Sequence, residues 1–221
     1  SICIGTNLSG STLGYHNNTL PKEFINCNLS NCDLSKLELP KTLSGCNFTN
    51  TKFPSKLEGY NLSRCTLTGA YLNSIYTCNL SEVQFTNSTL PSTISNCNFS
   101  GSNFSGSSFK SRSYSSYSND GYINNCNLTN CNLNNFSADG DISGSDLSGS
   151  VLTNANLSQA KISNSNLSRC DLTRTILPHN LNGLNLSGCD LSNLDLSEMN
   201  LESANLSNCK LTNTKLPIDL F

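Results

Sequence analysis

Apolar residues recur at every fifth position through most of the chain, most regularly between Ile142 and Leu216. A period of five fits neither the 3.6-residue period of a helix nor the two-residue alternation of a flat strand. Short fixed periods are typical of proteins in which similar units stack on one another. We therefore expect an extended stack of short units. The apolar positions of this stretch after Ile142 are Leu147, Leu152, Leu157, Ile162, Leu167, Leu172, Leu177, Leu181, Leu186, Leu191, Leu196, Leu201, Leu206, Leu211 and Leu216.

Each apolar position belongs to a recurrent five-residue unit. A small residue stands two positions before it, Asn or Asp directly before it, and Ser or Thr followed by Gly or Asn after it, as in residues 145–149. Gly and Asn tolerate the positive φ that a tight type II bend requires. Each unit is thus predicted to be a very short extended piece followed by a bend, with the apolar and small residues facing inward.

Residues 155–159 (Ala-Asn-Leu-Ser-Gln) and 204–208 (Ala-Asn-Leu-Ser-Asn) match the pattern Ala-Asp/Asn-Leu-x-x. With these units in tandem, nearly the whole chain resembles the pentapeptide-repeat family. The resemblance implies an all-β fold, a right-handed quadrilateral parallel β-helix with one unit per side and about twenty residues per coil. The 221 residues would then form about eleven coils. We expect a single domain over 1–221, with irregular segments near 14–19, 73–77 and 110–122.

All six prolines occur in one context, in which the next apolar position comes four residues later instead of five. Proline restricts its own φ to a narrow range and suits the first central position of a tight turn. We interpret each segment as a shortened side, and a small bulged loop is the competing interpretation. The eight-residue gap from Leu72 to Leu80 similarly indicates two short sides or one loop. The proline segments are 20–24, 39–43, 53–57, 90–94, 177–181 and 216–220.

Eleven of the twelve cysteines stand two residues before an apolar position, where Ala and Ser stand elsewhere, and only Cys3 departs from this rule. A free cysteine behaves as a small buried hydrophobe, so we expect free structural thiols. Metal ligation by pairs such as Cys27 and Cys32 is the alternative, but two histidines in the whole chain do not supply a zinc cluster. So many unpaired thiols favour a reducing cytoplasm, and no secretory signal or membrane-spanning run is visible.

The net charge is −2 and only 13% of the residues are charged, which excludes a basic nucleic-acid-binding surface. The only histidines, His16 and His179, have no partner at a recognisable catalytic spacing, so we expect no enzyme and no cofactor. Asp139, Asp141 and Asp146 suggest calcium, but Asp141 and Asp146 occupy the position where Asn is commonest. Their spacing does not supply the six or more oxygens that calcium requires, so we expect no metal site.

The least regular segment holds the candidate partner-binding loop, whose residues are Lys110, Arg112, Tyr114, Tyr117 and Tyr122. Aromatic and basic side chains on an exposed loop can bind a protein partner or a single-stranded nucleic acid. The alternative is a serine-rich loop whose tyrosines only cover the outside of a coil.

The last residues, Leu216, Ile218, Leu220 and Phe221, are markedly apolar. A stack of coils leaves open strand edges and apolar interior at its ends. The resemblance implies that this end forms a homodimer interface. A final side that folds back and closes its own coil is the alternative.

The preferred function is a non-catalytic scaffold that binds a protein partner in a bacterial cytoplasm. The resemblance also implies an alternative, because some members mimic DNA, bind DNA gyrase (a type II topoisomerase) and protect it from quinolones or toxins. That role needs a strongly negative surface, and fifteen acidic against thirteen basic residues place it second. An ice-binding rod is a third interpretation, which the threonines scattered among Ser and Asn argue against.

Overall fold

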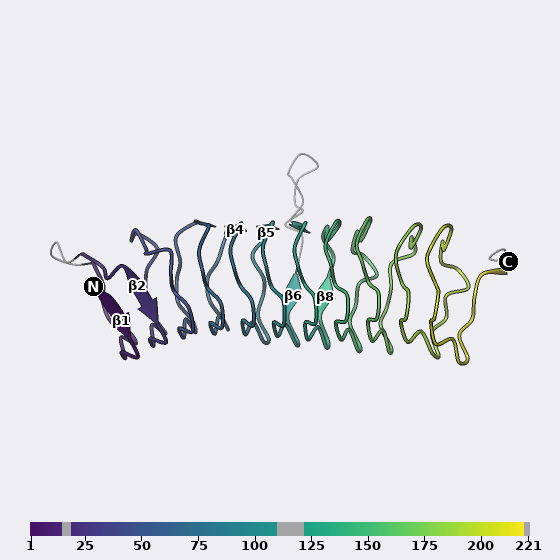
Figure 1. Ribbon diagram of the computed structural model, residues 1–221, viewed down its shortest axis with the longest axis horizontal. Coiled ribbons are helices and arrows are strands. Elements are labelled where there is room, and N and C mark those ends of the chain that lie inside the picture. Colours follow the sequence, from purple (N-terminus) through teal and green to yellow (C-terminus); the bar gives the residue numbers. More distant parts are fainter. Residues whose placement is uncertain (15–18, 110–121, 219–221) are drawn as a thin grey trace.

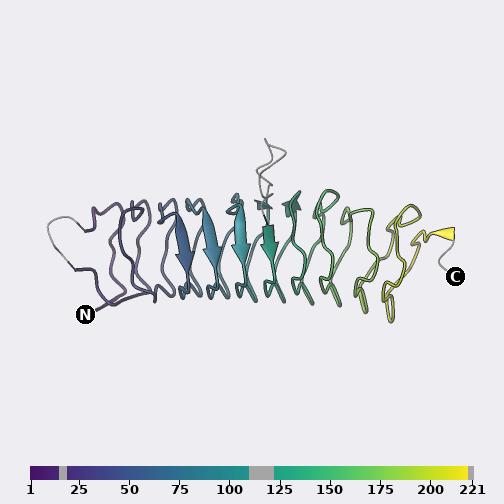
Figure 2. The ribbon, with the colours of Figure 1, turned by 90° about the horizontal axis from the view of Figure 1, so that it is seen from above.

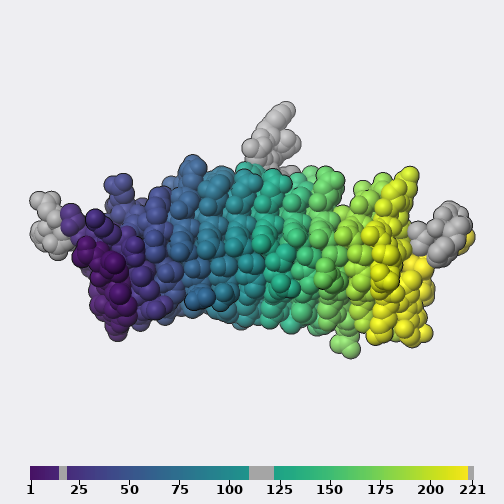
Figure 3. Space-filling model, viewed as in Figure 1, coloured from purple at the N-terminus to yellow at the C-terminus, as the bar shows by residue number. Residues whose placement is uncertain are grey.

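The computed structural model describes residues 1–14, 19–109 and 122–218, and these form a rod of coils stacked along one axis. Successive coils follow one another from the N-terminal to the C-terminal end of the rod (Figures 1 and 3). Every strand pair and every isolated bridge between coils is parallel. The predicted four-sided parallel β-helix is confirmed.

Within the described residues, eight strands of two or three residues are long enough to be named, since a bend follows each extended piece. They are β1 (Ile2–Ile4), β2 (Glu23–Ile25), β3 (Lys56–Glu58), β4 (Ser74–Tyr76), β5 (Thr93–Ser95), β6 (Ser108–Phe109), β7 (Tyr122–Asn124) and β8 (Ser137–Ala138). The sheets are β1-β2, β3-β4-β5-β7 and β6-β8. The four strands of the second sheet lie side by side along one side of the rod (Figure 2).

The pairing register gives the length of each coil. Asp146 pairs with Asn166 in a coil whose four sides are all full. Thr42 pairs with Asn61 in a coil that contains a proline segment, and this offset is shorter by one residue, as expected for a four-residue side. Strand β4 lies in the gap between Leu72 and Leu80 and pairs with β3. Here Lys56 pairs with Ser74, and this offset is one residue shorter than the offset between Thr42 and Asn61. The predicted number of about eleven coils stays a prediction, because three segments lie outside the described residues.

The recurrent apolar residues fill a narrow interior. Leu157, Leu167 and Leu191 are all fully buried. Phenylalanines fill its middle part, where the Phe85 and Phe104 rings stack with centroids 5.6 Å apart. Beyond them Phe136 takes the position of a small residue and Ala138 that of a large one. The exchange keeps the local volume filled, as close packing of large against small residues requires.

The small inward residues also make hydrogen bonds between coils. The Thr51 hydroxyl donates to the Leu29 carbonyl at 2.7 Å, and the Cys65 thiol donates to the Leu43 carbonyl at 2.9 Å. A serine at this position can make two bonds, because Ser102 accepts from the Val83 amide at 3.1 Å and donates to the Leu80 carbonyl at 2.9 Å. Ser, Thr and Cys therefore replace one another here because each carries a donor that a buried carbonyl needs.

Candidate interaction surfaces

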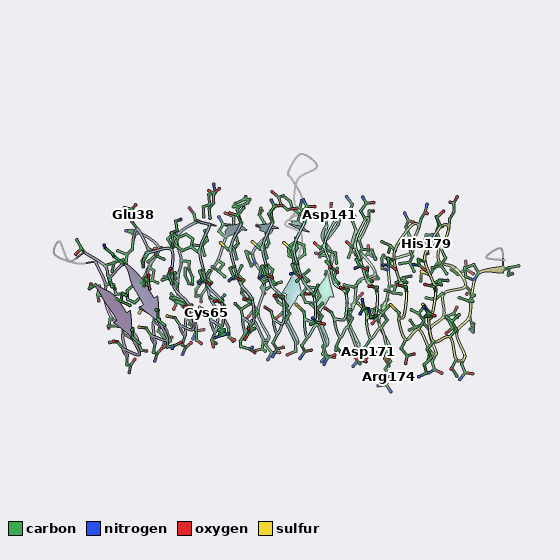
Figure 4. All side chains as sticks on the ribbon, in the orientation of Figure 1. Glu38, Cys65, Asp141, Asp171, Arg174 and His179 are labelled. Carbon is green, nitrogen blue, oxygen red and sulfur yellow. The ribbon has the colours of Figure 1, made fainter. Side chains whose placement is uncertain are left out.

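The twelve cysteines are free, and ten of them are buried. Their inward position is the predicted one, and Cys65 lies inside the stack in Figure 4. Burial raises the pKa of the Cys46, Cys131 and Cys170 thiols to about 12. Thiols so buried and so weakly acidic are poor nucleophiles and poor metal ligands.

The interior is tightly packed in the middle of the rod. The void lined by residues from Leu90 to Leu157 measures about 10 Å³, roughly the space of one water molecule. Within the described ranges, no group of three or more His, Cys, Asp or Glu side chains could hold a metal ion. Nor does any helix in these ranges have the length and apolar character needed to cross a bilayer. The outer faces and the ends of the rod carry the remaining candidate surfaces.

One outer face carries a row of asparagines, which we call the asparagine face. The Asn79 amide group donates to Asn61 at 3.4 Å, and Asn98 donates to Asn79 at 3.3 Å. The Asn79 side-chain oxygen also accepts from the Ser81 backbone amide at 3.2 Å, which holds the bend. Because the side chains of the row bond to one another or to the backbone of their own bend, the row is a preorganised and nearly uncharged surface. Its members are Asn61, Asn79, Asn98, Asn127, Asp146, Asn166, Asn185 and Asn205.

Another face carries aromatic and cationic side chains over the β3-β4-β5-β7 sheet. The Lys56 ammonium lies 5.3 Å from the Tyr76 ring centroid and 2.6 Å from a Glu58 carboxylate oxygen. The Lys41 ammonium lies 3.9 Å from the Tyr60 ring centroid. Tyr60 itself is buried in the core, so we call Lys41, Lys56, Tyr76 and Tyr122 the tyrosine–lysine patch.

Tyr76 and Tyr122 connect strands that are not neighbours. They lie on β4 and β7, with β5 between them, and their side chains are close enough to interact. Partial burial and the neighbouring Tyr76 side chain raise the pKa of Tyr122. The two rings therefore form a partly exposed aromatic surface across the middle of the sheet.

A family model describing pentapeptide repeats matches the chain in eight copies, over residues 78–111, 141–177 and 180–216. The chain belongs to the pentapeptide-repeat family. None of the curated proteins matches it.

Solved structures of pentapeptide-repeat proteins are among those similar to the chain. HetL, involved in heterocyst differentiation regulation in the cyanobacterium Nostoc sp. strain PCC 7120, is 22% identical, with 98% of this chain and 83% of HetL covered and a TM-score of 0.44. Full-length QnrB1, a plasmid-mediated fluoroquinolone resistance protein, is 22% identical, with coverages of 99% and 87% and a TM-score of 0.26. Rfr23 from the cyanobacterium Cyanothece 51142 is 17% identical, with coverages of 80% and 90% and a TM-score of 0.17.

The predicted partner-binding loop of this pentapeptide-repeat protein is described only at Tyr122, which lies in β7 and is half-buried. Lys110, Arg112, Tyr114 and Tyr117 lie outside the described residues. Sequence reasoning missed the other members of the patch. The signal was available, because the repeat register between consecutive coils places Tyr76 beside Glu58.

The predicted dimer interface is described at two of its four residues. Leu216 is partly buried, and Ile218 is 97% exposed. Leu220 and Phe221 lie outside the described ranges. Near this end two lysines pair with aspartates of the preceding coil, Lys210 with Asp190 at 2.9 Å and Lys215 with Asp195 at 2.7 Å. The interface stays a prediction.

The remaining candidate residues, the histidines and the aspartates considered for catalysis or calcium binding, do not form one site within the described part of the chain. His179 is exposed, and its carbonyl accepts from the Asn200 amide. Asp141 and His179 point outward near one edge of the rod, and Asp171 and Arg174 lie toward the opposite edge (Figure 4). His16 lies outside the described residues. Thr68 and Thr86 lie on one side of adjacent coils, with their hydroxyls 3.4 Å apart. Ser105 and Asn134 follow on this side in the next two coils, so the threonines do not form a continuous row.

Proposed function

We propose that this pentapeptide-repeat protein is a non-catalytic scaffold that binds a protein partner through the tyrosine–lysine patch. The support is the composition of the patch, because tyrosines are enriched at the centres of protein interfaces. Lys56 is positioned by Glu58 and Tyr76, so the patch loses little side-chain entropy on binding.

The predicted loop would extend the same surface. Lys110, Arg112, Tyr114 and Tyr117 precede Tyr122 in the chain, and Tyr122 is already a member of the patch. An arginine and two further tyrosines would enlarge the aromatic surface and add a planar donor for carboxylates. We propose that patch and loop act together, with the patch as their rigid base.

Site-specific cross-linking tests this proposal. A photoreactive amino acid placed at Tyr76 should capture one defined protein from native lysate, and the same group at Asn98 on the asparagine face should not. Binding of the purified partner should then weaken on Tyr76→Ala and Tyr122→Ala and stay unchanged on Asn98→Ala. Equal capture from both faces, or a partner indifferent to both tyrosines, would reject the patch.

The DNA mimic that targets gyrase is the second candidate, and one observation favours it. Residues 139–202 contain eight acidic residues against three basic ones, a net charge of −5 within a chain whose total is −2. A supercoiling assay with purified gyrase, with and without a quinolone, tests this role. If a large molar excess of the protein neither slows supercoiling nor protects the enzyme, the mimic is excluded.

We further propose that residues 1–221 form one domain, that the protein resides in the cytoplasm, and that Leu216, Ile218, Leu220 and Phe221 form a homodimer interface. The exposure of Ile218 supports the interface, because an isolated isoleucine side chain in water is unfavourable. Removing residues 217–221 and measuring the mass in solution tests it. A dimer that persists after truncation would reject this interface.

A further inference from the structure

The thiols of Cys3 and Cys27 are in direct contact between the first two coils. Cys3 lies in β1, and Cys27 follows β2 by two residues. Their sulfur atoms are 3.5 Å apart, and the Cys27 thiol is also 3.3 Å from the Cys3 carbonyl oxygen. A disulfide needs a sulfur–sulfur distance of about 2 Å, so a shift of roughly 1.5 Å would join them.

One thiol of this pair, Cys3, is reachable from solvent, whereas Cys27 is buried beneath it. Cys3 is only partly buried, and within the described residues its strand β1 pairs with β2 alone. A cavity of about 280 Å³ beside it is lined by Cys3, Leu8, Leu13, Leu20 and Phe24, among others. Such a space admits a small oxidant to the Cys3 sulfur.

The other neighbouring thiols do not share this access. Cys78, Cys97 and Cys126 lie at equivalent positions in successive coils, each donates its thiol to a backbone carbonyl, and all three are buried. Oxidation there would require a coil to open first. Cys209, the other partly buried cysteine, donates its thiol to the Leu186 carbonyl at 3.0 Å. Cys209 is therefore a matched control, because it is partly exposed like Cys3 but, among the described residues, has no thiol in contact with it.

We propose that Cys3 and Cys27 form a redox-modification site, which a small disulfide such as oxidised glutathione converts to an intramolecular disulfide. The Cys3 thiolate attacks one sulfur of oxidised glutathione, which forms a mixed disulfide and releases one glutathione thiolate. The Cys27 thiol then loses its proton to that thiolate or to water. Its sulfur attacks the Cys3 sulfur and expels the second glutathione. The protein loses two hydrogens, and one oxidised glutathione becomes two reduced ones.

The bond would join the first coil to the second. Cys3 and Cys27 enclose the segment that contains residues 14–19, where the five-residue pattern is interrupted. In the chain-entropy account, cross-linking such a loop stabilises the fold by restricting the unfolded chain. Oxidation should therefore raise the temperature at which the protein unfolds.

Treating the full chain with oxidised glutathione, and then blocking free thiols and mapping peptides by mass spectrometry, tests the proposal. We expect one Cys3–Cys27 cross-link, a loss of two hydrogens per molecule and an upward shift of Tm that a reductant reverses. Cys3→Ser should abolish the cross-link and the shift, and Cys209→Ser should change neither.

Three outcomes would overturn the proposal. Both thiols could remain reduced while a small dithiol in the same buffer is fully oxidised. Cys3 could stop at the glutathione adduct, or the cross-link could join two molecules. Circular dichroism of reduced Cys3→Ser confirms that loss of the bond does not reflect loss of the fold. The test is independent of the tyrosine–lysine patch.

Discussion

The hydroxyl of Ser150 donates to the carbonyl oxygen of Leu128 in the preceding coil at 2.7 Å. The same hydroxyl accepts from the Cys131 amide at 2.9 Å, and Ser150 is fully buried. We predict that Ser150→Ala destabilises the protein by roughly 1–3 kcal/mol, because it leaves buried backbone groups without partners. Ser150→Cys should cost less, because a thiol can still donate. Urea unfolding measures both, with the outward-facing Ser148→Ala as control. If Ser150→Ala and Ser148→Ala unfold at the same urea concentration, the buried bonds are not stabilising.

The bend at Gly45 is restricted by its neighbour in the preceding coil. Its φ is +68°, and a Cβ atom added there would overlap the Asn26 side-chain oxygen. Gly183 has the same φ with nothing within 4 Å of the added atom. Both Gly→Ala changes should cost about 1–2 kcal/mol from the left-handed backbone, and Gly45→Ala should cost more because of the overlap. Equal unfolding midpoints for the two variants would show that Asn26 moves aside freely.

Stability should fall at alkaline pH because of the buried thiols. Burial holds the pKa of Cys46, Cys131 and Cys170 near 12 in the fold, whereas their ordinary value is 9.0. A folded pKa above the unfolded one stabilises the fold below the lower value. That contribution is lost as the pH rises from about 9 to about 12. Unfolding at a series of pH values measures this, and Cys131→Ser should reduce the slope. A flat profile in this range would contradict the burial of these thiols.

Asp195 is held charged by Lys215 and Ser197. Its carboxylate accepts from the lysine ammonium at 2.7 Å and from the serine hydroxyl at 2.6 Å, which holds its pKa at about 2 against an ordinary 3.8. Lys215→Ala should raise this pKa, as an NMR pH titration of the carboxyl carbon would show. Any stability gained from the lowered pKa is present above pH 3.8 and is lost as the pH falls toward 2. Lys161→Ala is the control and should leave the Asp195 titration unchanged.

The sequence was sufficient for the fold because one rule repeats. Leu157 is buried for the same reason as Leu167, and each five-residue unit predicts the next. The sequence pattern correctly predicted that the thiols face inward, but it explained only part of the reason. Their size accounts for the burial of Cys65, but only the structure shows that its thiol donates to Leu43.

The candidate surface was less predictable, because it depends on the offsets between coils. Tyr76 and Tyr122 are distant in the chain, and they meet only because β4 and β7 flank β5 in one sheet. A one-residue error in either coil would turn one ring to the opposite face. The contact of Cys3 with Cys27 was missed for a related reason, since Cys3 is the one cysteine outside the repeat rule.

Thr93 pairs with Ser74 in the coil before it and with Tyr122 in the coil after it, and the second connection is longer than the first by ten residues. β5 and β7 still pair in parallel across this longer connection, as β4 and β5 do across the shorter one. The connection between β5 and β7 is therefore a site where the length of the chain can change. A foreign peptide grafted there would be displayed on a rigid support, and its length could vary without disturbing the register of the rod.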